Sequence, residues 1–454
     1  MKKKRIVLIN PQYPFGKKRI FLGGPFVAIG ARLDAVGHDV SLLDLNIDDM
    51  TDTKIVAKLE EADFIGVSLT GSSDIPGVRE LVTVLHQRFS RALVLLGGQI
   101  VERLAPDQFV AIFGNDVVQI RDDGDLAKAI ACSVDQLSSS DASYVPMWQS
   151  LGDNRLAVYL KNEAVLVVSQ GCRFNCRFCA ATKGVSEQFR EIGVFEQDLN
   201  YLTEVARRKR IAELNFYLSS LDAFQNPQKF VRYLEVVARV AKRSGVNIRL
   251  RCLSRFDSFL RAVDSVPNLP DLLCRSGLWC IGFGADGADP AIWKSQGKGN
   301  KNSDMLRAIT LCQQMRIRTE LLMVIGFPED TPATLAKAVS ASLLAVVRWS
   351  DVVIRPYLAK VVVPGSHGWK EKHQADQFVG DPEKFYNLDF CAVGSLSTHP
   401  HHAHRWACNI AYLLICGILT PIGKCATYPL LPQGGGGIYG RIAKIVNRMI
   451  PFDK

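Results

Sequence analysis

Short apolar runs alternate with amphipathic stretches through most of this 454-residue chain, and this alternation restricts the fold more than any other feature. Apolar runs of about four to eight residues are typical of strands buried on both faces, as in parallel sheets. The amphipathic stretches between them supply helices that cover the two faces of such a sheet. The pattern therefore predicts an α/β fold in which ligands bind beyond the carboxyl ends of the strands.

The alternation falls into two blocks. Residues 1–132 predict a doubly wound, Rossmann-like domain, and residues 133–160, which include a polar serine-rich run, predict a linker. Residues 161–365 predict a partial (β/α)6 barrel, and residues 366–454 predict an irregular or helical segment that covers the barrel or contacts substrate. The six predicted barrel strands are residues 164–170, 213–220, 247–253, 279–286, 319–327 and 351–359.

Composition narrows the class of protein further. Apolar residues make up 48% of the chain and charged residues 22%, which excludes a disordered or fibrous protein. The net charge of +10 is spread along the chain, so no nucleic-acid partner is expected. No apolar run predicts a signal peptide or a transmembrane segment. We expect a cytoplasmic protein whose twelve cysteines are thiols or metal ligands rather than disulfides.

Three of these cysteines, Cys172, Cys176 and Cys179, have the spacing C-x3-C-x2-C directly after a predicted strand. Iron–sulfur clusters usually take four cysteine ligands, so three on one loop can hold three irons of a [4Fe–4S] cube and leave the fourth iron open. A zinc site and three unrelated cysteines are the alternatives. Zinc usually needs a fourth Cys or His, and the loop contains none.

With this loop the chain resembles the radical S-adenosylmethionine (SAM) enzymes, in which the same spacing follows the first strand of a partial barrel. The resemblance covers about residues 161–366. It implies that SAM binds the open iron and that one electron cleaves it to a 5′-deoxyadenosyl radical, which abstracts a hydrogen atom. It also implies an electron donor such as flavodoxin or ferredoxin.

Further segments match this family in order and imply contacts with SAM. The end of the second strand carries Ser219, Ser220 and the acid Asp222, where relatives bind the SAM ammonium through an acidic or a small polar group, and either kind of group is open here. Arg255 lies where relatives bind the SAM carboxylate. Asp286 would meet the ribose and Gly326 the adenine. Helix capping by the serines, a surface position for Arg255 and a turn at Asp286 are the structural alternatives. The implied SAM contacts are Phe178, Ser219, Ser220, Asp222, Arg255, Asp286 and Gly326.

The first domain lacks the G-x-G-x-x-G fingerprint of NAD and FAD domains. It resembles instead the cobalamin-binding domain that precedes the barrel in one subgroup of radical SAM enzymes. Glycines would let the macrocycle approach the backbone, and hydroxyls would bind its nucleotide tail. The D-x-H-x-x-G motif that supplies a histidine to cobalt is absent, so residues 10–24 would cover the lower face. The implied cobalamin contacts are Asn10, Pro11, Ser68, Thr70, Gly71, Gly97, Gly98, Gln99 and Gly124. A domain of this fold that has lost its ligand is the alternative.

The C-terminal segment has features whose roles stay open. An apolar run at residues 410–419 predicts a helix over the barrel. The sequence RIAKIVNRMI at residues 441–450 predicts either a packed terminal helix or an interfacial helix in peripheral contact with a membrane. A metal site, or side chains that face solvent or substrate, are the alternatives for His399, His401, His402 and His404. A second cluster or buried thiols are the alternatives for Cys391, Cys408, Cys416 and Cys425.

These features predict a cobalamin-dependent radical SAM enzyme with a [4Fe–4S] cluster, SAM and cobalamin. The first hypothesis is a methyltransferase that moves a methyl group from methylcobalamin to an unactivated carbon of a small-molecule or lipid-like substrate. One SAM molecule would methylate cob(I)alamin, and a second would generate the radical. Radical cyclisation, ring contraction, carbon–carbon coupling and oxidation are alternative reactions. A non-catalytic cobalamin or iron–sulfur sensor is the alternative of another class.

Overall fold

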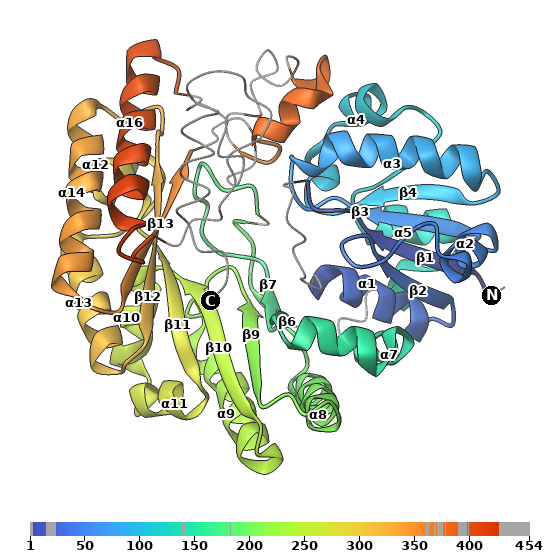
Figure 1. The fold of residues 1–454 in the computed structure, drawn as a ribbon, viewed down its shortest axis with the longest axis horizontal. Helices are drawn as coiled ribbons and strands as arrows, with labels where there is room; N and C mark the ends of the chain where they lie inside the picture. The colour runs from blue at the N-terminus through green and yellow to red at the C-terminus, as the bar shows by residue number, and fades with distance from the viewer. Residues whose placement is uncertain are drawn as a thin grey trace.

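In the computed structural model, two parallel β-sheets lie side by side, and helices cover each of them (Figure 1). The structure describes residues 3–14, 24–137, 142–181, 183–359, 363–366, 369, 376, 378–388, 397 and 399–425. Three earlier predictions lie outside these residues: the interfacial segment 441–450, Cys391, and residues 15–23 of the segment expected to cover the corrin.

The N-terminal sheet has five parallel strands in the order β2-β1-β3-β4-β5, which confirms the predicted Rossmann-like fold. The order reverses between β1 and β3, and ligands of doubly wound sheets bind at such a reversal. The strands are β1 (Arg5–Asn10), β2 (Asp39–Asp44), β3 (Phe64–Ser68), β4 (Leu93–Gly97) and β5 (Val118–Ile120). The helices are α1 (Gly24–Ala35), α2 (Thr53–Glu60), α3 (Asp74–Arg88), α4 (Pro106–Phe113) and α5 (Asp123–Ile130), with a 3₁₀ turn η1 (Val101–Arg103).

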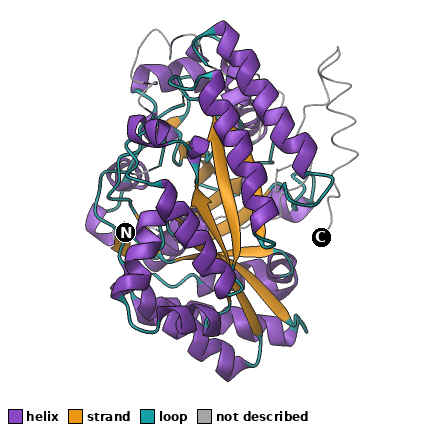
Figure 2. Cartoon of the chain, turned by 90° about the vertical axis from the view of Figure 1, so that its left-hand side faces the viewer, coloured by secondary structure: helices purple, strands orange, loops and turns teal. Residues whose placement is uncertain are grey.

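The second sheet has six parallel strands in the order β13-β12-β11-β10-β9-β6, each beside its neighbour in the chain, as in an open barrel. The predicted strands are all present, and helices surround them (Figure 2). The strands are β6 (Glu163–Val167), β9 (Glu213–Ser219), β10 (Asn247–Ser254), β11 (Leu278–Gly284), β12 (Arg318–Ile325) and β13 (Val352–Leu358). The helices are α8 (Ile192–Arg208), α9 (Pro227–Ser244), α10 (Phe256–Ser265), α11 (Leu269–Arg275), α12 (Pro290–Ser295), α13 (Asn302–Gln314) and α14 (Pro332–Arg348), with a 3₁₀ turn η2 (Asp286–Ala288).

Two barrel strands, β9 and β10, alternate between buried residues and more exposed ones. In β9 and β10 every second residue is fully buried and belongs to the core shared with the helices. The half-buried residues form the other face, and on it ion pairs join the strands. Nη2 of Arg251 in β10 lies 2.7 Å from Oε2 of Glu163 in β6. Nη2 of Arg355 in β13 lies 2.9 Å from Oε1 of Glu320 in β12. Apolar packing outside and ion pairs inside therefore hold the sheet together.

The segment predicted as a linker contains two helices, α6 (Val134–Leu137) and α7 (Val145–Leu160). Helix α7 packs against α1 and β2 of the first domain and against β6 and α8 of the second. The hydroxyl of Tyr159 donates to Asp44 Oδ2 at 2.7 Å, which ties α7 to the end of β2. The linker is thus a packed helix that fixes the two sheets relative to each other.

The C-terminal residues divide between the two domains. The 3₁₀ helix η4 (Pro382–Leu388) packs on α3, and Trp369 joins the core of the N-terminal domain. Helix α16 (His402–Leu419) packs on α14 and β13, which confirms the predicted helix over the barrel. Among the described residues, no helix is long and apolar enough to cross a membrane.

Candidate active site

The cysteine loop leaves the carboxyl end of β6 and turns back on itself between β7 (Ser169–Gln170) and β8 (Gln188–Phe189). Gly171 has a φ of +86°, and a Cβ there would lie 2.8 Å from the carbonyl oxygen of Ser186. Glycine is therefore required at this turn. Lys183 Nζ donates to the carbonyl oxygens of Cys176 and Cys179, which fixes the loop from its returning side.

Cys172, Cys176 and Cys179 are half-buried free thiols. Burial raises the pKa of Cys172 to about 11 and raises that of Cys176, where cationic Lys298 and Arg255 oppose the shift. Thiolates here need added positive charge, which bound iron supplies. Across the described chain, no three His, Cys, Asp or Glu side chains gather closely enough for a single metal ion. A cluster that takes one thiolate per iron suits the loop better than one shared zinc ion.

Arg255 joins the cysteine loop from the end of β10. Its Nη1 lies 3.8 Å from Sγ of Cys176, and its guanidinium carbon lies 4.0 Å from the centre of the Phe174 ring. Asp257 accepts a hydrogen bond from Nε of Arg255 at 2.9 Å. Arg255 is buried, unlike a surface cation, and holds its charge next to the thiol of Cys176.

Asp222 lies beneath Arg255 and is only 1% exposed. Its Oδ1 accepts hydrogen bonds from Ser254 Oγ at 2.9 Å and from the Arg255 backbone N–H at 3.3 Å. Burial raises the pKa of Asp222. The contacts of Asp222 therefore stabilise the end of β10 and position Arg255.

Glu187, which no sequence motif marks, is the acid beside the serines. Its Oε1 accepts hydrogen bonds from Ser169 Oγ at 2.5 Å and from Ser220 Oγ at 3.2 Å, while its Oε2 is buried without a hydrogen-bond partner in the structure as described. Burial raises the pKa of Glu187. Ser219 is half-buried at the end of β9 nearby. A buried carboxylate oxygen that lacks a partner, next to hydroxyls, suits an ammonium group.

Asp286 forms an ion pair with Lys298, and both side chains are almost fully buried. Asp286 has a φ of +33° in the tight turn η2, so the ion pair holds a strained backbone position. Lys298 Nζ also lies 5.6 Å from the centre of the Phe178 ring, which ties the pair to the cysteine loop. The acid expected beside a ribose thus has a lysine partner, and no motif marks that lysine.

The end of β12 closes the same edge. Gly326, with a φ of +95°, precedes Phe327, whose ring centre lies 5.4 Å from that of Phe178. Asp330 Oδ2 accepts hydrogen bonds from the backbone N–H groups of Gly326 and Phe327 at 2.7 and 2.9 Å. Two aromatic rings and a glycine turn therefore lie together at the carboxyl ends of the barrel strands, where a planar base could stack.

The N-terminal sheet has a very different opening at its carboxyl edge. A cavity there lies between the sheet and helices α1 and α5, and its lining is almost entirely apolar. Gly98 has a φ of +110°, and a Cβ there would lie 2.4 Å from the carbonyl oxygen of Leu69. Gly66 in the middle of β3 lines the cavity, together with Ser68, Gly97 and Gly98 at the ends of β3 and β4. Glycines keep this space open, and a flat apolar group such as the base of a cobalamin tail fits its lining.

The other predicted cobalamin contacts surround this cavity at different places. Thr70, Gly71 and Gln99 follow the ends of β3 and β4 at the same edge. Gly124 lies in the first turn of α5, which Asp122 caps by accepting a hydrogen bond from the N–H of Asp125 at 2.9 Å. Gly124 is thus part of a helix whose later residues line the cavity.

Asn10 and Pro11 are held by the end of β2. Asn10 Nδ2 donates to Asp44 Oδ1 at 3.0 Å, and the Pro11 carbonyl accepts from Asn46 Nδ2 at 3.2 Å. Asp44 also binds Tyr159 of α7. These residues fix the start of the loop beyond β1, and their polar groups are already used.

The C-terminal histidines lie on the outer side of the β12 end. The ring centres of His399, His401 and His404 are 4.9–5.8 Å apart, and His402 is exposed. His399 is buried, with Nε2 3.2 Å from the carbonyl oxygen of Asp330, and burial lowers its pKa. Cys408 and Cys416 are buried thiols and Cys425 is half-buried. The described residues offer no metal-binding group of three here, so packing roles fit these side chains.

Comparison with known proteins agrees with this geometry. The model of the B12 binding domain matches residues 20–130, and that of the radical SAM superfamily matches residues 166–340. An uncharacterized methyltransferase of Pyrococcus horikoshii is 22% identical over 73% of this chain and 76% of its own. An anaerobic magnesium-protoporphyrin IX monomethyl ester cyclase of Synechocystis is 25% identical over 72% of this chain and 69% of its own.

A solved structure has the same fold over nearly its whole length. The radical SAM methyltransferase TsrM of Kitasatospora setae, with cobalamin and a [4Fe–4S] cluster bound, superimposes with a TM-score of 0.65. The match covers 98% of this chain and 99% of that one, at 14% sequence identity. At this identity the likeness concerns the fold.

Proposed function

Because the chain belongs to the radical SAM superfamily, in the subgroup with a B12-binding domain ahead of the barrel, we propose that it is a cobalamin-dependent C-methyltransferase. One observation carries the proposal: a single chain, made rigid by α7, carries a three-cysteine loop on one sheet and a glycine-edged apolar cavity on the other. The Pyrococcus relative is named a methyltransferase, and the match covers about three-quarters of each chain. The acceptor is an unactivated carbon of a small-molecule or lipid-like substrate.

The residues of the barrel edge divide the binding of the cluster and SAM among them. When bound, the cluster and SAM supply hydrogen-atom abstraction, and the corrin supplies the methyl group. Cys172, Cys176 and Cys179 would hold three irons, with the charges of Arg255 and Lys298 nearby to offset that of the thiolates.

Glu187 is our candidate for the SAM ammonium, together with Ser219 and Ser220, because its Oε2 lacks a partner among the described residues and its Oε1 already binds the Ser220 hydroxyl. Oδ2 of Asp222 lacks a partner too, but Asp222 is only 1% exposed, whereas Glu187 is half-buried and thus accessible to a ligand. Phe178 and Gly326 would border the adenine. Asp222 would act through Arg255 rather than touch SAM.

The cobalamin contacts divide in the same way between binding and support. Ser68, Gly97 and Gly98 would contact the nucleotide tail, since they line the cavity. Thr70, Gly71 and Gln99 would border it at the same edge. Asn10, Pro11 and Gly124 would support the site by fixing the loop after β1 and the start of α5. The domain boundaries proposed above, with a first domain of 1–132 and a barrel of 161–365, keep each binding edge within one domain.

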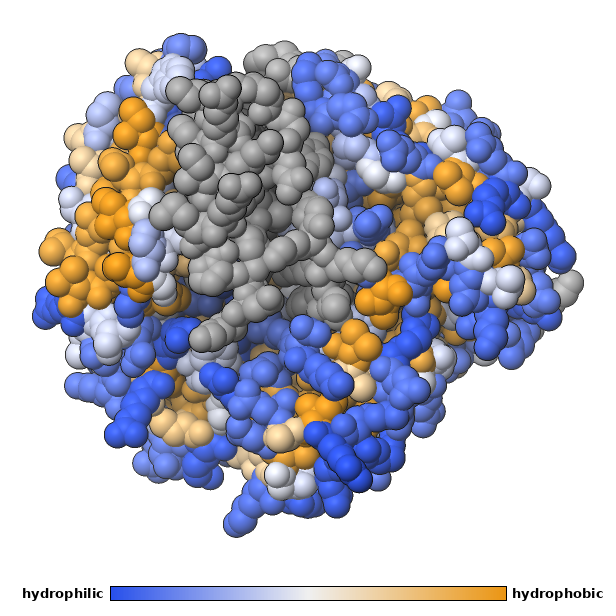
Figure 3. All heavy atoms as spheres, viewed as in Figure 1, coloured by the Kyte–Doolittle hydropathy of each residue, from blue (hydrophilic) through white to orange (hydrophobic). Residues whose placement is uncertain are grey.

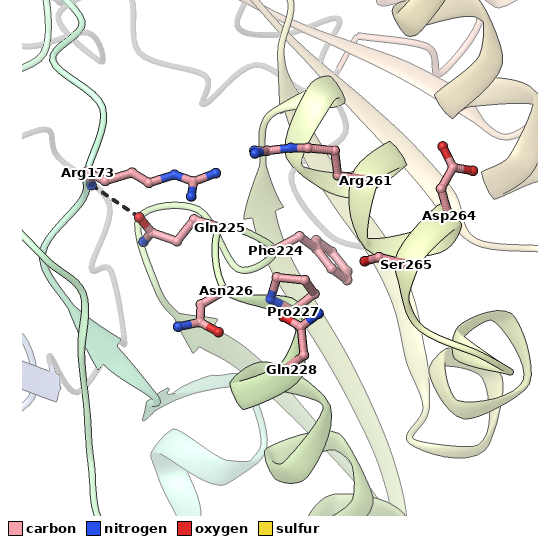
Figure 4. A pocket seen from close by; sticks show the side chains of 9 residues that line it. All are labelled: Arg173, Phe224, Gln225, Asn226, Pro227, Gln228, Arg261, Asp264 and Ser265. Atoms are coloured by element: carbon pink, nitrogen blue, oxygen red, sulfur yellow. Dashed lines mark hydrogen bonds between the residues drawn. The ribbon is translucent and has the colours of Figure 1, made fainter.

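The electron donor would approach the outer side of the cysteine loop. A hollow of about 590 Å³ adjoins Cys172, and exposed Arg173 and Arg261 extend over it from opposite sides (Figure 4). Arg177 is exposed on the same loop. This positive surface is complementary to a small acidic redox protein such as a flavodoxin or ferredoxin. A cytoplasmic location is part of the proposal.

The decisive test is anaerobic reconstitution with iron, sulfide and hydroxocobalamin, followed by turnover with SAM that carries a deuterated methyl group. The proposal expects cluster and corrin absorbance to survive gel filtration, and it expects the label in the product. Loss of the corrin on the column would overturn the cobalamin assignment.

The Synechocystis relative is named a cyclase, so cyclisation is the second candidate reaction. Release of 5′-deoxyadenosine with an unlabelled product would favour cyclisation or oxidation over methyl transfer. If the protein binds both cofactors but releases no 5′-deoxyadenosine, the result would support the non-catalytic sensor.

A further inference from the structure

Helix α16 is apolar on both of its faces. Its inner face, which includes Cys408, Tyr412, Ile415 and Leu419, is buried against the barrel. Its outer face carries exposed Ile410, Leu413, Leu414 and Ile418, spaced three and four residues apart. A helix that is apolar all round is normally buried in a core or in a membrane, yet no described helix is suited to span one. The outer face of α16 therefore needs another explanation.

The neighbouring helix enlarges this surface. Val347 and Leu344 of α14 are 84% and 67% exposed, and Ile422 is exposed just beyond α16. We call the α14–α16 face the set Leu344, Val347, Ile410, Leu413, Leu414, Ile418 and Ile422. It contains nearly half of the large exposed apolar side chains of the described chain, and Figure 3 shows such side chains gathered along the edge formed by these helices. Scattered exposed apolar residues are ordinary, but a gathered patch marks an interaction surface.

Charge around the face indicates what binds there. Neither α14 nor α16 contains an Asp or a Glu. Exposed Arg348 ends α14 and exposed Arg405 lies in the first turn of α16, while Lys424 follows α16. Two copies of such a surface would bring cations against cations, whereas anionic headgroups are complementary to cations that border an apolar strip.

The sequence that follows is of the same chemical kind. The chain continues for 29 residues beyond Cys425, and within them residues 441–450 place Arg441, Lys444 and Arg448 among apolar residues. Helix α16 is about 27 Å long, at 1.5 Å per residue over its 18 residues, and its outer apolar strip from Ile410 to Ile418 covers about 12 Å of that length. A helix with such a strip can lie in the plane of a bilayer interface.

We propose that the α14–α16 face docks the enzyme on the surface of an anionic lipid bilayer, with the two helices parallel to it. The apolar side chains enter the interfacial region, and Arg348, Arg405 and Lys424 contact phosphate groups. The inference does not depend on methyl transfer, because it concerns the outward-facing side chains of two helices that cover the barrel (Figure 1).

The test is flotation of the full-length, cluster-loaded protein with vesicles of phosphatidylcholine, alone or with about 30% phosphatidylglycerol. The proposal expects binding to the anionic vesicles that weakens as salt rises. The double variant Val347→Glu/Ile418→Glu should lower the partition coefficient about tenfold or more, since it removes two inserted apolar side chains. The double variant Val84→Glu/Val110→Glu, at exposed apolar positions on α3 and α4 of the other domain, is the control and should bind as the parent does.

Circular dichroism and cluster absorbance show whether each variant is folded. Absence of vesicle binding by the parent protein would overturn the proposal. A parent dimer that the double variant dissociates, without vesicle binding, would instead make the face an interface between two copies. Vesicle binding that the double variant retains would place the lipid contact elsewhere in the chain, and would equally overturn it.

Discussion

The carboxyl edges of the two sheets of this protein differ in the chemistry of their side chains. At the carboxyl edge of the N-terminal sheet, glycines and apolar side chains surround a cavity with almost no polar lining. At the carboxyl edge of the barrel, thiols, an arginine, a buried lysine–aspartate pair and a buried glutamate crowd together. We expect the first edge to select its ligand by shape and free space, and the second edge to select its ligand by charge. One fold principle, with ligands at the carboxyl ends of parallel strands, thus serves two kinds of cofactor.

Removal of one cluster ligand should give the largest difference between the two edges. Cys176→Ala should abolish cluster absorbance and reductant-dependent 5′-deoxyadenosine release, because three thiolates are the minimum for an open-cornered cube. Corrin retention on gel filtration should stay at the parent level, since the cavity belongs to the other sheet. Simultaneous loss of the corrin would mean that the two edges are one coupled site. Cys274→Ala, at an exposed thiol, is the control and should change neither cofactor.

Breaking the buried ion pair should destabilise the barrel. Lys298→Met leaves Asp286 buried without its cation, at a cost of about 3–5 kcal/mol in the free energy of unfolding. Thermal or urea unfolding of the apoprotein measures this cost. The double variant Lys298→Met/Asp286→Leu should recover much of the loss. A mild effect of the single variant would show that charge does not hold this edge together.

At the carboxyl edge of the N-terminal sheet, corrin affinity should depend on the free volume of the cavity. Gly98→Ala places a Cβ against the Leu69 carbonyl at a backbone angle that alanine disfavours, so the cavity must deform. Corrin affinity should fall about tenfold or more, with cluster content unchanged. Gly77→Ala, where a Cβ meets nothing within 4 Å, is the matched control and should keep full affinity. Corrin affinity unchanged in Gly98→Ala would remove the cavity from the binding site.

Glu187→Gln should give the smallest effect and the most specific one. Burial raises the pKa of Glu187 above its value in the unfolded chain. Folding is therefore favoured while Glu187 is protonated, and this contribution to stability is lost as pH rises through the pKa in the folded protein. Glutamine removes this loss, so the apoprotein should be more stable at neutral pH and its stability should depend less on pH. SAM affinity, measured by equilibrium dialysis, should fall about tenfold because the ammonium loses its counter-charge. Exposed Glu204→Gln should alter neither quantity, and unchanged SAM affinity in Glu187→Gln would exclude the ammonium role.

Local patterns predicted what depends on neighbours in sequence. The strands follow from runs of apolar residues, and the cysteine loop from spacing within eight residues. Glu187 and Lys298 could not be found in this way. Glu187 reaches Ser220 only because β7 pairs with β8, and Lys298 reaches Asp286 only because the chain returns after η2. The hydrogen bonds of Asp222 to the end of the neighbouring strand could not be read from the sequence either, because Ser254 and Arg255 lie more than thirty residues away.

The hydrogen bond from Tyr159 to Asp44 has a consequence for how a substrate arrives. The same carboxylate holds Asn10, so the connecting helix and the loop beyond β1 share one anchor. Swinging the halves apart would expose Tyr159 and Leu160, both almost wholly buried, at about 1.5–3 kcal/mol for each apolar side chain. Entry by a hinged opening of the halves is therefore disfavoured, and we expect an acceptor molecule to bind without separation of the two domains.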